Sequence, residues 1–510
     1  MDRRHTARER IALRFRVLEY KAPVPQEHGA YLVKDSWDDF GFSTTFDLIV
    51  RLQDGALARI GFLRIGHGQM ERDGWSRTAD RLSPSFAALT PGYFSLGMED
   101  DYYEQLQVKL PSTMAGEILT DLNDAAYVSH SDEWSPSLAV WHDSLLRGRT
   151  NTDLDRTRRI ARGIRRRIVP FRWSYTPEQE GILPAHEFTF ETTPGRKPPT
   201  NLHAVIGRNG VGKSHLLHAI AAQAAAGEIA VASDSGGSDN SFTSCVVVSF
   251  SPFDRRYRSA SEDDLPFHYI GLRHSDGLRL KSDRERRKEF VDSFAVARIG
   301  ARGVRWRNAI ATLNYAASGF LDHDMDLIDE MIREGRPARL ETAMGDVFEA
   351  LSSGHAIALL MITRLIEVVD ERTLVLIDEP ETHLHPPLLA ALTSALSTLL
   401  ADRNGMAVVA THSPVVLQEV PADCVWAMTR HGDELTVRRP DLETYGESVG
   451  ELTYEAFGLE VSSTGFHAAI AAEVEKGGTY EEITRRFTGL GAEARSLLRA
   501  MTFARTIESG

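Results

Sequence analysis

Apolar runs of strand length recur along the middle of the chain and are separated by helical patterns or insertions. Between residue 201 and about residue 430 these runs read LHAVIG, SCVVVSF, TLVLID and MAVVAT. Nearly continuous apolar strands are typical of a parallel sheet that is covered on both faces. We therefore predict an α/β domain over residues 201–430, interrupted by a helical insertion at about residues 255–350.

The first 155 residues follow a different pattern, in which apolar and polar positions alternate. The runs TTFDLIVRL and ALARIGFLRIG flank QDG, which predicts a β-hairpin that turns at Asp54 and Gly55. Helical spacing follows in DDYYEQLQVKL and AGEILTDLNDAAY. We expect a mixed, β-rich N-terminal region (1–155), a basic segment with the leading strands of the next domain (156–200), and a small helical C-terminal region of helices and turns (431–510).

Composition and charge exclude several classes of protein. With 510 residues, of which 42% are hydrophobic and 25% are charged, the chain is long enough for about two to four globular domains. No apolar run approaches the roughly 18 residues of a membrane helix, and the N-terminus MDRRHTARERIALRFRV has no signal-peptide core. Cys245 and Cys424 lie in apolar, strand-like runs, so we expect buried thiols and no disulfide framework. These features predict a cytoplasmic protein that does not enter membranes.

The stretch GRNGVGKS carries the clearest chemistry in the chain. It matches G-x-x-x-x-G-K-S, follows the strand LHAVI and opens the helix HLLHAIAAQAAA. The alternative is a chance glycine-rich turn, and the strand before it and the helix after it argue against that alternative. Backbone N–H groups of such a loop turn inward around phosphate, Lys213 reaches the outer phosphates and Ser214 can bind Mg²⁺. The predicted ATP-binding residues are Gly207, Arg208, Asn209, Gly210, Val211, Gly212, Lys213 and Ser214.

An acidic motif supplies the complementary half of such a site. In TLVLIDEPE, apolar strand residues lead to Asp378 at the carboxyl end of the strand, where it can hold Mg²⁺ together with Ser214. Glu379, the next residue, is the natural candidate to orient or deprotonate an attacking water. The alternative is an acidic turn after a buried strand that has no role in catalysis. The phosphate loop upstream argues against this alternative.

Three further motifs make the chain resemble the head of ABC-type ATPases over roughly residues 170–430. They are LSSGH at 351–355, THLHP at 382–386 directly after DEPE, and ATHSP at 410–414. The resemblance implies that Ser352, Ser353 and Gly354 form a signature motif, which completes the ATP site of a second protomer. Two chains would then close head to tail across two ATP molecules. By the same resemblance, residues 381–386 form the D-loop at that interface, and the catalytic residues are Lys213, Glu379 and the switch histidine His412.

Two departures from the family pattern concern the signature and the loop after the second strand. The signature reads LSSGH where transporters commonly have LSGGQ. No glutamine occurs between Gln223 and Gln418, so the usual Q-loop glutamine is absent. SFSPFD at 249–254 occupies the corresponding strand end, and Ser251 or Asp254 is the candidate replacement as a contact to Mg²⁺ or water.

The D-loop sequence favours one branch of this superfamily. EPETHLHP followed by THSP is similar to the soluble branch of RecF-type and overcoming-lysogenization (AAA_21-like) ATPases, whereas transporters usually have a D-loop like SALD. Ser214 and Ser352 are only 138 positions apart (352 − 214) without sustained heptads, which excludes the long coiled coil of chromosome-structure ATPases. The residues after His412 show no acidic strand pattern of a Toprim domain, so we expect any nuclease to be another polypeptide.

Within that branch the chain looks most like the PtuA ATPases of Septu-like and retron-associated antiphage systems. The compact head, WDDFGFSTTFDLIV at 37–50 and GLEV near the C-terminus carry this likeness. It implies an ATPase that dimerises on ATP and regulates a separate HNH-type nuclease in antiphage defence. Three alternatives stay open: a RecF-type ATPase of DNA repair or recombination, a scaffold or sensor that hydrolyses little ATP, and the motor of a transporter.

Basic residues gather between residues 156 and 172, although the net charge of the chain is −14. Five arginines recur at helical spacing and can track a nucleic-acid backbone, with Arg172 and Trp173 adding a stacking site. A solvated helix face or an acidic protein partner fits the pattern equally well, and the same holds for KSDRERRK at 281–288. The five arginines are Arg158, Arg159, Arg162, Arg165 and Arg166.

Two other patterns predict no further chemistry. GESVG at 446–450 fits a hydrolase nucleophile motif, but PDLETY before it is not a buried strand. His383, His385 and His412 would suggest zinc, yet the D-loop and switch positions already account for them. Mg²⁺ is therefore the metal that we expect.

Overall fold

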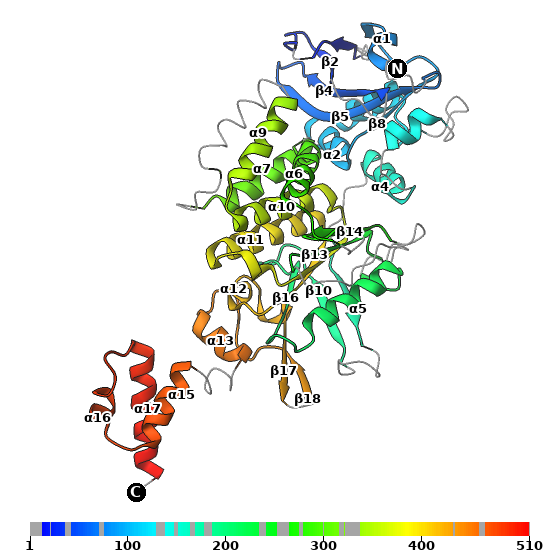
Figure 1. Ribbon diagram of the computed structural model, residues 1–510. Helices are drawn as coiled ribbons and strands as arrows, with labels where there is room; N and C mark the ends of the chain where they lie inside the picture. Colours follow the sequence, from blue (N-terminus) through cyan, green and yellow to red (C-terminus); the bar gives the residue numbers. More distant parts are fainter. Residues whose placement is uncertain are drawn as a thin grey trace, which may run out of the picture. The chain divides into compact units, whose positions relative to one another are not determined.

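The computed structural model describes residues 13–20, 22–35, 42–70, 76–128, 138–146, 151–163, 169–177, 186–233, 241–251, 265–274, 279–298, 300–315, 321, 337–431, 434–457 and 465–508. The chain divides into two compact units, which Figure 1 draws in sequence colours. The N-terminal unit comprises Met1–Arg167 with Ile299–Val304, and the head unit comprises Ile168–Arg298 with Arg305–Gly510.

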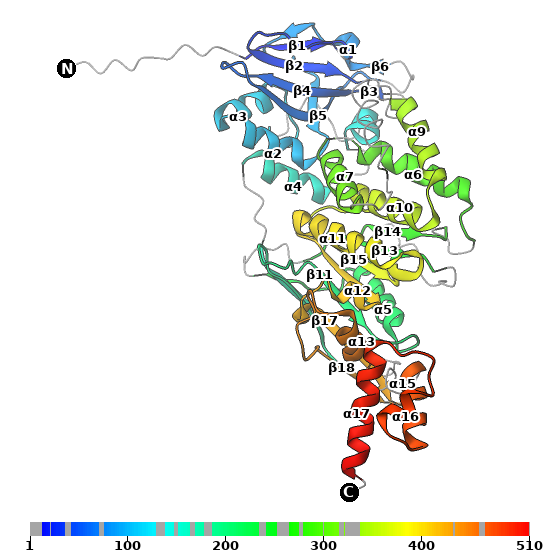
Figure 2. The ribbon, with the colours of Figure 1, turned by 90° about the vertical axis from the view of Figure 1, so that its left-hand side faces the viewer.

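A six-stranded sheet forms the centre of the N-terminal unit, in the order β7-β1-β2-β4-β5-β8 (Figure 2). β1 and β2 are parallel, and the other neighbours are antiparallel. β4 and β5 pair around the turn at Asp54 and Gly55, so the predicted hairpin is confirmed. The strands are β1 (Phe15–Leu18), β2 (Gly29–Lys34), β4 (Thr45–Arg51), β5 (Leu57–His67), β7 (Ser85–Phe86) and β8 (Tyr93–Gly97), and β3 (Phe42–Ser43) pairs separately with β6 (Ser76–Arg77).

Helices share an apolar core with this sheet. α2 covers the first stretch of predicted helical spacing and α3 covers the start of the second, so both helices are confirmed. Phe46 of the sheet, Leu106 of α2 and Ile118 of α3 are all fully buried in the same core. The helices are α1 (Thr78–Arg81), α2 (Asp100–Lys109), α3 (Ser112–Asp121) and α4 (Asn151–Ala161), with a π-helical turn at Trp141–Leu146.

A seven-stranded sheet forms the centre of the head unit, in the order β14-β13-β15-β16-β11-β17-β18. The first six strands are parallel. Four of them, β11, β13, β15 and β16, are the apolar runs that the sequence predicts, whereas β14 and β17 were not predicted. Parallel strands place their carboxyl ends at one edge, so the segments after β11, β13, β15 and β16 lie together there. The strands are β11 (Leu202–Ile206), β13 (Ser244–Ser249), β14 (Phe267–Gly271), β15 (Thr373–Asp378), β16 (Met406–Thr411), β17 (Val425–His431) and β18 (Glu434–Arg438).

Strand β18 corrects the expectation of helices and turns alone after residue 430. ELTVR pairs antiparallel with β17, and its apolar residues Leu435 and Val437 pack against the head core. Their alternation with Thr436 is the period-two signal of a half-buried strand, which the sequence analysis did not use.

A three-stranded sheet, β10-β9-β12, shares a buried core with helix α5 (Lys213–Ala225) on one face of the head sheet. Trp173 lies on the buried side of β9, where it stacks on Phe190 with ring centroids 4.5 Å apart and donates from Nε1 to Met406 Sδ at 3.0 Å. The predicted stacking site at Trp173 is therefore wrong, because its ring belongs to the core. The strands are β9 (Phe171–Tyr175), β10 (Phe188–Thr192) and β12 (Ala232–Ser233).

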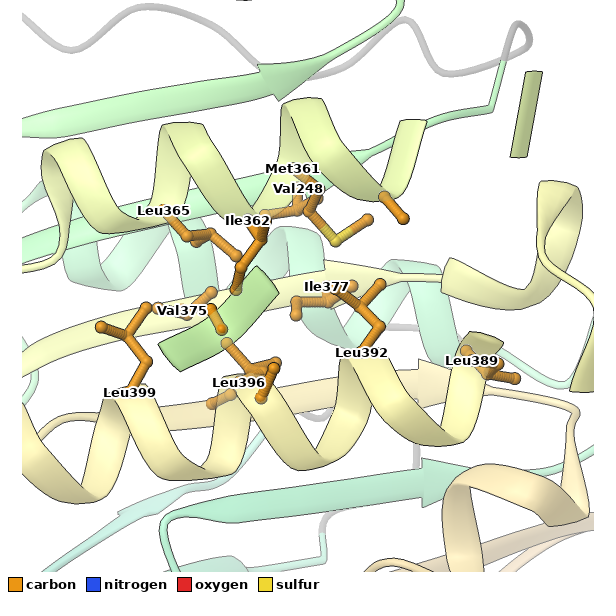
Figure 3. Close-up of a cluster of buried hydrophobic side chains, with 14 of the residues drawn as sticks. Val248, Met361, Ile362, Leu365, Val375, Ile377, Leu389, Leu392, Leu396 and Leu399 are labelled. Carbon is orange, nitrogen blue, oxygen red and sulfur yellow. The ribbon is translucent and has the colours of Figure 1, made fainter. Parts of the chain in front are cut away.

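Helices α10 (Ser353–Val368) and α11 (Pro386–Arg403) cover the opposite face of the head sheet. Alternate residues of β13 and β15 point to the two faces, so Val248 and Ile377 meet these helices while Val247 and Leu376 meet α5. Figure 3 shows how closely the two layers interdigitate, with Met361, Ile362 and Leu365 of α10 and Leu392, Leu396 and Leu399 of α11 around Val375 and Ile377.

The remaining helices belong to the insertion and to the C-terminal segment. The insertion predicted at about residues 255–350 is helical in α6, α7 and α9, but it also contributes strand β14 to the head sheet, which corrects the prediction. Phe290 of α6 and Met344 of α9 are buried together with α10. The last three helices share a small core of their own around Ile483 and Leu498. None of the helices in the described ranges is both long and apolar enough to span a bilayer. These helices are α6 (Asp283–Ala297), α7 (Gly300–Leu313), α9 (Pro337–Ala350), α12 (Pro414–Leu417), α13 (Val449–Phe457), α15 (Gly465–Glu475), α16 (Tyr480–Thr484) and α17 (Ala492–Glu508).

Candidate nucleotide site

The predicted phosphate loop joins the end of β11 to the start of α5. Gly210 and Gly212 have φ values of 79° and 116°, a region that side chains other than glycine rarely adopt. At Gly207, an added Cβ would lie 2.4 Å from the carbonyl oxygen of Met428 on β17. The three glycines are thus required by the backbone itself, and the loop leads the N-terminal N–H groups of a 13-residue helix to the carboxyl edge of the sheet.

Lys213 is almost completely buried at the base of this loop, with 4% of its surface exposed. Its Nζ donates hydrogen bonds to the carbonyl oxygens of Gly207 at 2.8 Å and Arg208 at 3.1 Å, which hold the ammonium under the loop. Burial lowers the pKa of Lys213, while the nearby carboxylates of Glu379, Glu381 and Asp378 oppose that shift. A buried cation beneath a ring of N–H groups fits a phosphate group.

Ser214 and Asp378 face each other across the loop and the sheet. The Oγ of Ser214 donates to Oδ1 of Asp378 at 3.0 Å, and Asp378 is 9% exposed at the last position of β15. A hydroxyl and a carboxylate are the hard oxygen ligands that Mg²⁺ prefers beside a nucleotide. The donor set therefore fits Mg²⁺, although the sequence placed these two residues 164 positions apart.

Glu379 follows directly and adopts an unusual backbone conformation. Its φ of 44° is left-handed, which costs a residue with a side chain on the order of 1 kcal/mol. The backbone N–H of Glu379 donates to the carbonyl oxygen of Ala410 on β16 at 2.9 Å, which fixes the turn. Strain of this kind tends to persist where a side chain must be aimed at a site.

His412 lies against two carboxylates of the DEPE turn, at the end of β16. Its Nδ1 is 3.0 Å from Oε1 of Glu381 and 3.9 Å from Oε1 of Glu379. The same oxygen of Glu381 accepts hydrogen bonds from the backbone N–H of His412 at 2.6 Å and from the hydroxyl of Thr411 at 2.8 Å. The sequence analysis assigned Glu381 only to the D-loop. The signal it missed is a second carboxylate two residues after Glu379, within the short 3₁₀ turn η2 (Pro380–His383).

The signature residues form the first turn of α10. Ser352 caps the helix, since its Oγ accepts from the backbone N–H of His355 at 3.4 Å and lies 3.1 Å from Nδ1 of the same residue. Ser352 and Ser353 are exposed. An added Cβ at Gly354 would lie 2.6 Å from the carbonyl oxygen of His383, so glycine allows the signature turn to rest on η2.

The two D-loop histidines have structural partners of their own. Nε2 of His383 lies 3.3 Å from the carbonyl oxygen of Phe250, and Nδ1 of His385 accepts from the backbone N–H of Leu388 to cap α11. Across the described parts of the chain, no group of three histidine, cysteine or acidic side chains forms a metal cluster.

The candidate replacements for the Q-loop glutamine are placed only in part. Ser251 comes two residues after Ser249, which pairs with Asp378 in the register of β13 and β15. Ser251 therefore follows the strand next to the Mg²⁺ position. Asp254 lies outside the described residues, so its assignment stays a prediction.

The basic segments differ from each other. Arg158, Arg159 and Arg162 lie in or directly after α4, whereas Arg165 and Arg166 fall outside the described residues. The stretch 281–288 opens α6 with a capping box of Ser282 and Glu285, and four of its five cations form ion pairs with acidic side chains. The pairs are Lys281 with Glu289, Arg286 with Asp283, Arg287 with Asp346, and Lys288 with Asp292.

Residues 247–418 match the family described as "AAA domain, putative AbiEii toxin, Type IV TA system". This range includes Asp378, Glu379 and His412 and begins after the phosphate loop. The strand order and the phosphate loop show the predicted fold class, an α/β ABC-type P-loop NTPase head.

Two solved ABC transporter proteins are similar to the chain at low identity. The first is cbiO1 from Clostridium perfringens, part of the transporter complex cbiONQ, with 14% identity, a TM-score of 0.28, and coverage of 57% of this chain and 94% of that one. The second is a nucleotide-free ATP-binding cassette from an ABC transporter, with 12% identity, a TM-score of 0.27, and coverage of 53% and 91%.

A full-length likeness is found to one protein of a bacteriophage. Protein ea59 of Escherichia phage lambda is 35% identical over 529 aligned residues, which cover 97% of this chain and 99% of the relative. The likeness therefore extends beyond the head unit to both ends of the chain. The chain belongs to the family of protein ea59.

Proposed function

We propose that the chain binds and hydrolyses ATP at the edge of the head sheet. The observation that carries this proposal is the meeting of a buried cation, a hydroxyl–carboxylate pair and a carboxylate–imidazole pair from three separate segments. They are Lys213 and Ser214 at the start of α5, Asp378 and Glu379 at the end of β15, and His412 after β16.

Each residue has a role in this mechanism. The N–H groups of the loop and Lys213 hold the phosphates, and Mg²⁺, when bound by Ser214 and Asp378, offsets their charge. Glu379 orients a water molecule and accepts its proton as the water oxygen bonds to the γ-phosphorus. The bond from that phosphorus to the bridging oxygen breaks, ADP leaves with the electron pair, and His412 stabilises charge on the γ-phosphate.

The second half of the site would come from another copy of the chain. Ser352, Ser353 and Gly354 are displayed at the start of α10, two of them exposed, as a signature motif that faces a partner's γ-phosphate would require. Nucleotide binding then favours the closed dimer and hydrolysis opens it, so that turnover becomes a conformational switch.

The switch acts on a separate effector, which we infer to be an HNH-type nuclease of antiphage defence. The PtuA-like motifs support this role, and so do the AbiEii toxin name of the matching family and the phage origin of protein ea59. A RecF-type function in DNA repair uses the same ATP cycle and is the competing proposal. Arg158, Arg159 and Arg162 would then contact the DNA.

Two substitutions with opposite consequences test the ATPase. Glu379→Gln should bind ATP and stay as a closed dimer without turnover, while Lys213→Ala should fail to bind ATP and stay open. Light scattering with and without ATP, together with phosphate release, measures both. Normal turnover in Glu379→Gln would overturn the role of this residue, and ATP binding by Lys213→Ala would overturn the site.

Mixing two inactive variants tests the shared site. Ser352→Arg damages the signature and Lys213→Ala damages the phosphate loop, so a mixed dimer contains one intact composite site. Partial recovery of turnover on mixing is expected. If two folded, dimerising variants recover nothing at any ratio, the head-to-tail arrangement is wrong.

The effector is tested by isolating Glu379→Gln with ATP from the native host. Mass spectrometry of a stoichiometric nuclease supports the defence role. Recovery of DNA with repair proteins and no nuclease supports the RecF-type alternative, and recovery of the ATPase alone with slow turnover in the unmutated protein supports the scaffold.

A further inference from the structure

Glu381 is buried inside its own subunit, although its D-loop position suggests an interface residue. Its side chain is 8% exposed, less than that of Glu379 at 30%. The contacts of Oε1 all reach the junction of β16 and α12, namely the hydroxyl of Thr411 and the backbone and ring of His412. The carboxylate therefore belongs to the switch histidine of the same chain.

We infer that Glu381 is the positioning residue of His412, and that its carboxylate keeps the imidazole cationic and holds the proton on Nδ1. A carboxylate beside one ring nitrogen fixes the tautomer and the ring orientation, which leaves the other nitrogen as a donor to substrate. The inference rests on the proposed ATPase function, in which Nε2 of His412 serves the γ-phosphate.

Charges around the ring act in the same direction. The close contact of Nδ1 with the carboxylate of Glu381 raises the pKa of His412, with further support from the charge of Glu379, while burial and Lys213 oppose it. Burial alone would raise the pKa of Glu381, but hydrogen bonds from His412 and Thr411 outweigh it and the pKa is lowered. The two groups therefore stabilise each other as an ion pair.

This pairing divides the work between two carboxylates. Glu381 lies 0.9 Å closer to Nδ1 than Glu379 does, from the distances of 3.0 and 3.9 Å. Glu381 forms the ion pair with the imidazolium of His412. The more exposed Glu379 therefore remains available to accept a hydrogen bond from the attacking water. The site then holds a fixed cation and a free base, which a single carboxylate shared between water and histidine would not provide.

Glu381→Gln isolates the charge from the shape. The amide oxygen of glutamine can still accept from Thr411 and from the backbone of His412. Its nitrogen takes the place of Oε2, which makes no hydrogen bond within the described residues. We expect kcat to fall about 10- to 100-fold with little change in KM for ATP. The alkaline limb of the pH–rate profile should also move to lower pH.

A matched control is Glu419→Gln, which neutralises a half-buried carboxylate whose pKa is raised by burial and which is not among the groups that shift the pKa of His412. This variant should keep the rate and the pH profile of the unmutated protein. An equal loss of rate in Glu381→Gln and Glu419→Gln would point to general destabilisation and would overturn the positioning role.

The ring itself can be observed without turnover. In the full chain labelled at histidine Cε1, the His412 signal is assigned by its loss in His412→Ala and titrated by NMR without nucleotide. Its pKa should lie above the ordinary histidine value and fall in Glu381→Gln. An unchanged His412 pKa in folded Glu381→Gln overturns the inference even if ATP is hydrolysed. The expected shift upholds the ion pair even if hydrolysis is absent and the proposed function fails.

Discussion

The two units of the chain each bury an aspartate among hydrogen-bond donors, but they do so in different ways. In the N-terminal unit, Asp124 is fully buried and accepts from the hydroxyl of Tyr103 at 3.0 Å and from the backbone N–H of Ala126 at 3.0 Å. In the head unit, Asp378 is at the open end of a strand and its partner is the hydroxyl of Ser214. One cluster is closed on itself, and the other faces the phosphate loop.

The consequence is visible in the charge of each group. Burial raises the pKa of Asp124 to about 7 in spite of its hydrogen bonds, and no cation among the described residues offsets that shift. The head site combines Lys213 with three acidic side chains in the same small volume. Buried carboxylates are therefore not a sign of function by themselves. A site for a charged ligand needs opposite charges and an open side.

The same substitution in both units should separate these roles most strongly. Asp378→Asn removes the proposed Mg²⁺ ligand and should lower ATP turnover about 100- to 1,000-fold, with a small change in stability. Asp124→Asn should leave turnover per folded molecule unchanged. Phosphate release, normalised to the folded fraction by circular dichroism, measures both. Equal loss of turnover in the two variants would abolish the distinction drawn between the clusters.

Removing one hydroxyl from each cluster should affect stability more in the N-terminal unit than in the head unit. Tyr103→Phe removes the hydroxyl that donates to Asp124 and accepts from the backbone N–H of Gly97, so we expect a loss of about 2 kcal/mol in unfolding free energy. Ser214→Ala should cost less than about 1 kcal/mol but raise the Mg²⁺ concentration needed for turnover. Urea unfolding measures the stability of both variants, and Mg²⁺ titration measures the metal requirement of turnover. A larger loss of stability in Ser214→Ala than in Tyr103→Phe would contradict the comparison.

The local parts of the nucleotide site could be predicted from the sequence. The phosphate loop is contiguous, and Asp378 and Glu379 directly follow an apolar strand, so strand, turn and helix signals suffice. The pairing of Glu381 with His412 could not be predicted. These residues are 31 positions apart, and the register of β15 and β16 and the turn η2 decide which carboxylate reaches the ring.

The fold shows the same division. Apolar runs predicted four of the six parallel strands, and alternation predicted the hairpin of β4 and β5. Trp173 was misplaced because its strand carries exposed Arg172 between buried aromatic residues, and only the packing of β9 on β10 shows which side is covered. Within residues 281–288, the ion pairs of Arg286 and Lys288 join residues at helical spacing and could be predicted from the sequence. Arg287 pairs with Asp346 of a different helix, which the sequence does not indicate.

Stability should depend on pH with opposite signs in the two clusters. Asp124 has a folded pKa of about 7 against an ordinary 3.8, so the folded state holds its proton more tightly than the unfolded state. Its contribution to stability is full below about pH 4 and is lost as pH rises to about 7, at no more than about 1.4 kcal/mol per unit. Glu381 has a lowered pKa, so its contribution is present above the ordinary value and lost on acidification.

Hydrogen exchange read by mass spectrometry can follow each unit separately. Peptides from β8 and α3 should exchange faster as pH rises from 4 to 7, after correction for the intrinsic rate, and Asp124→Asn should remove this dependence. Peptides from β16 should become less protected toward low pH, and Glu381→Gln should weaken that trend. If protection from exchange changes with pH in the same direction in both units, Asp124 and Glu381 do not have the opposite pKa shifts that their surroundings indicate.

The signature turn is a third kind of cluster, exposed but held by its own residues, and it should give the smallest effect. Asparagine can place its amide nitrogen near the position of Nδ1 in His355, so His355→Asn should retain the contact with Ser352 Oγ that spans 3.1 Å. His355→Ala removes it and should lower turnover about three- to tenfold. In a Ser352→Ala background the two variants should behave alike, because the hydroxyl that they orient is gone. If His355→Ala still lowers turnover by the same factor there, His355 acts through another contact, and the signature turn depends on more than its own first residues.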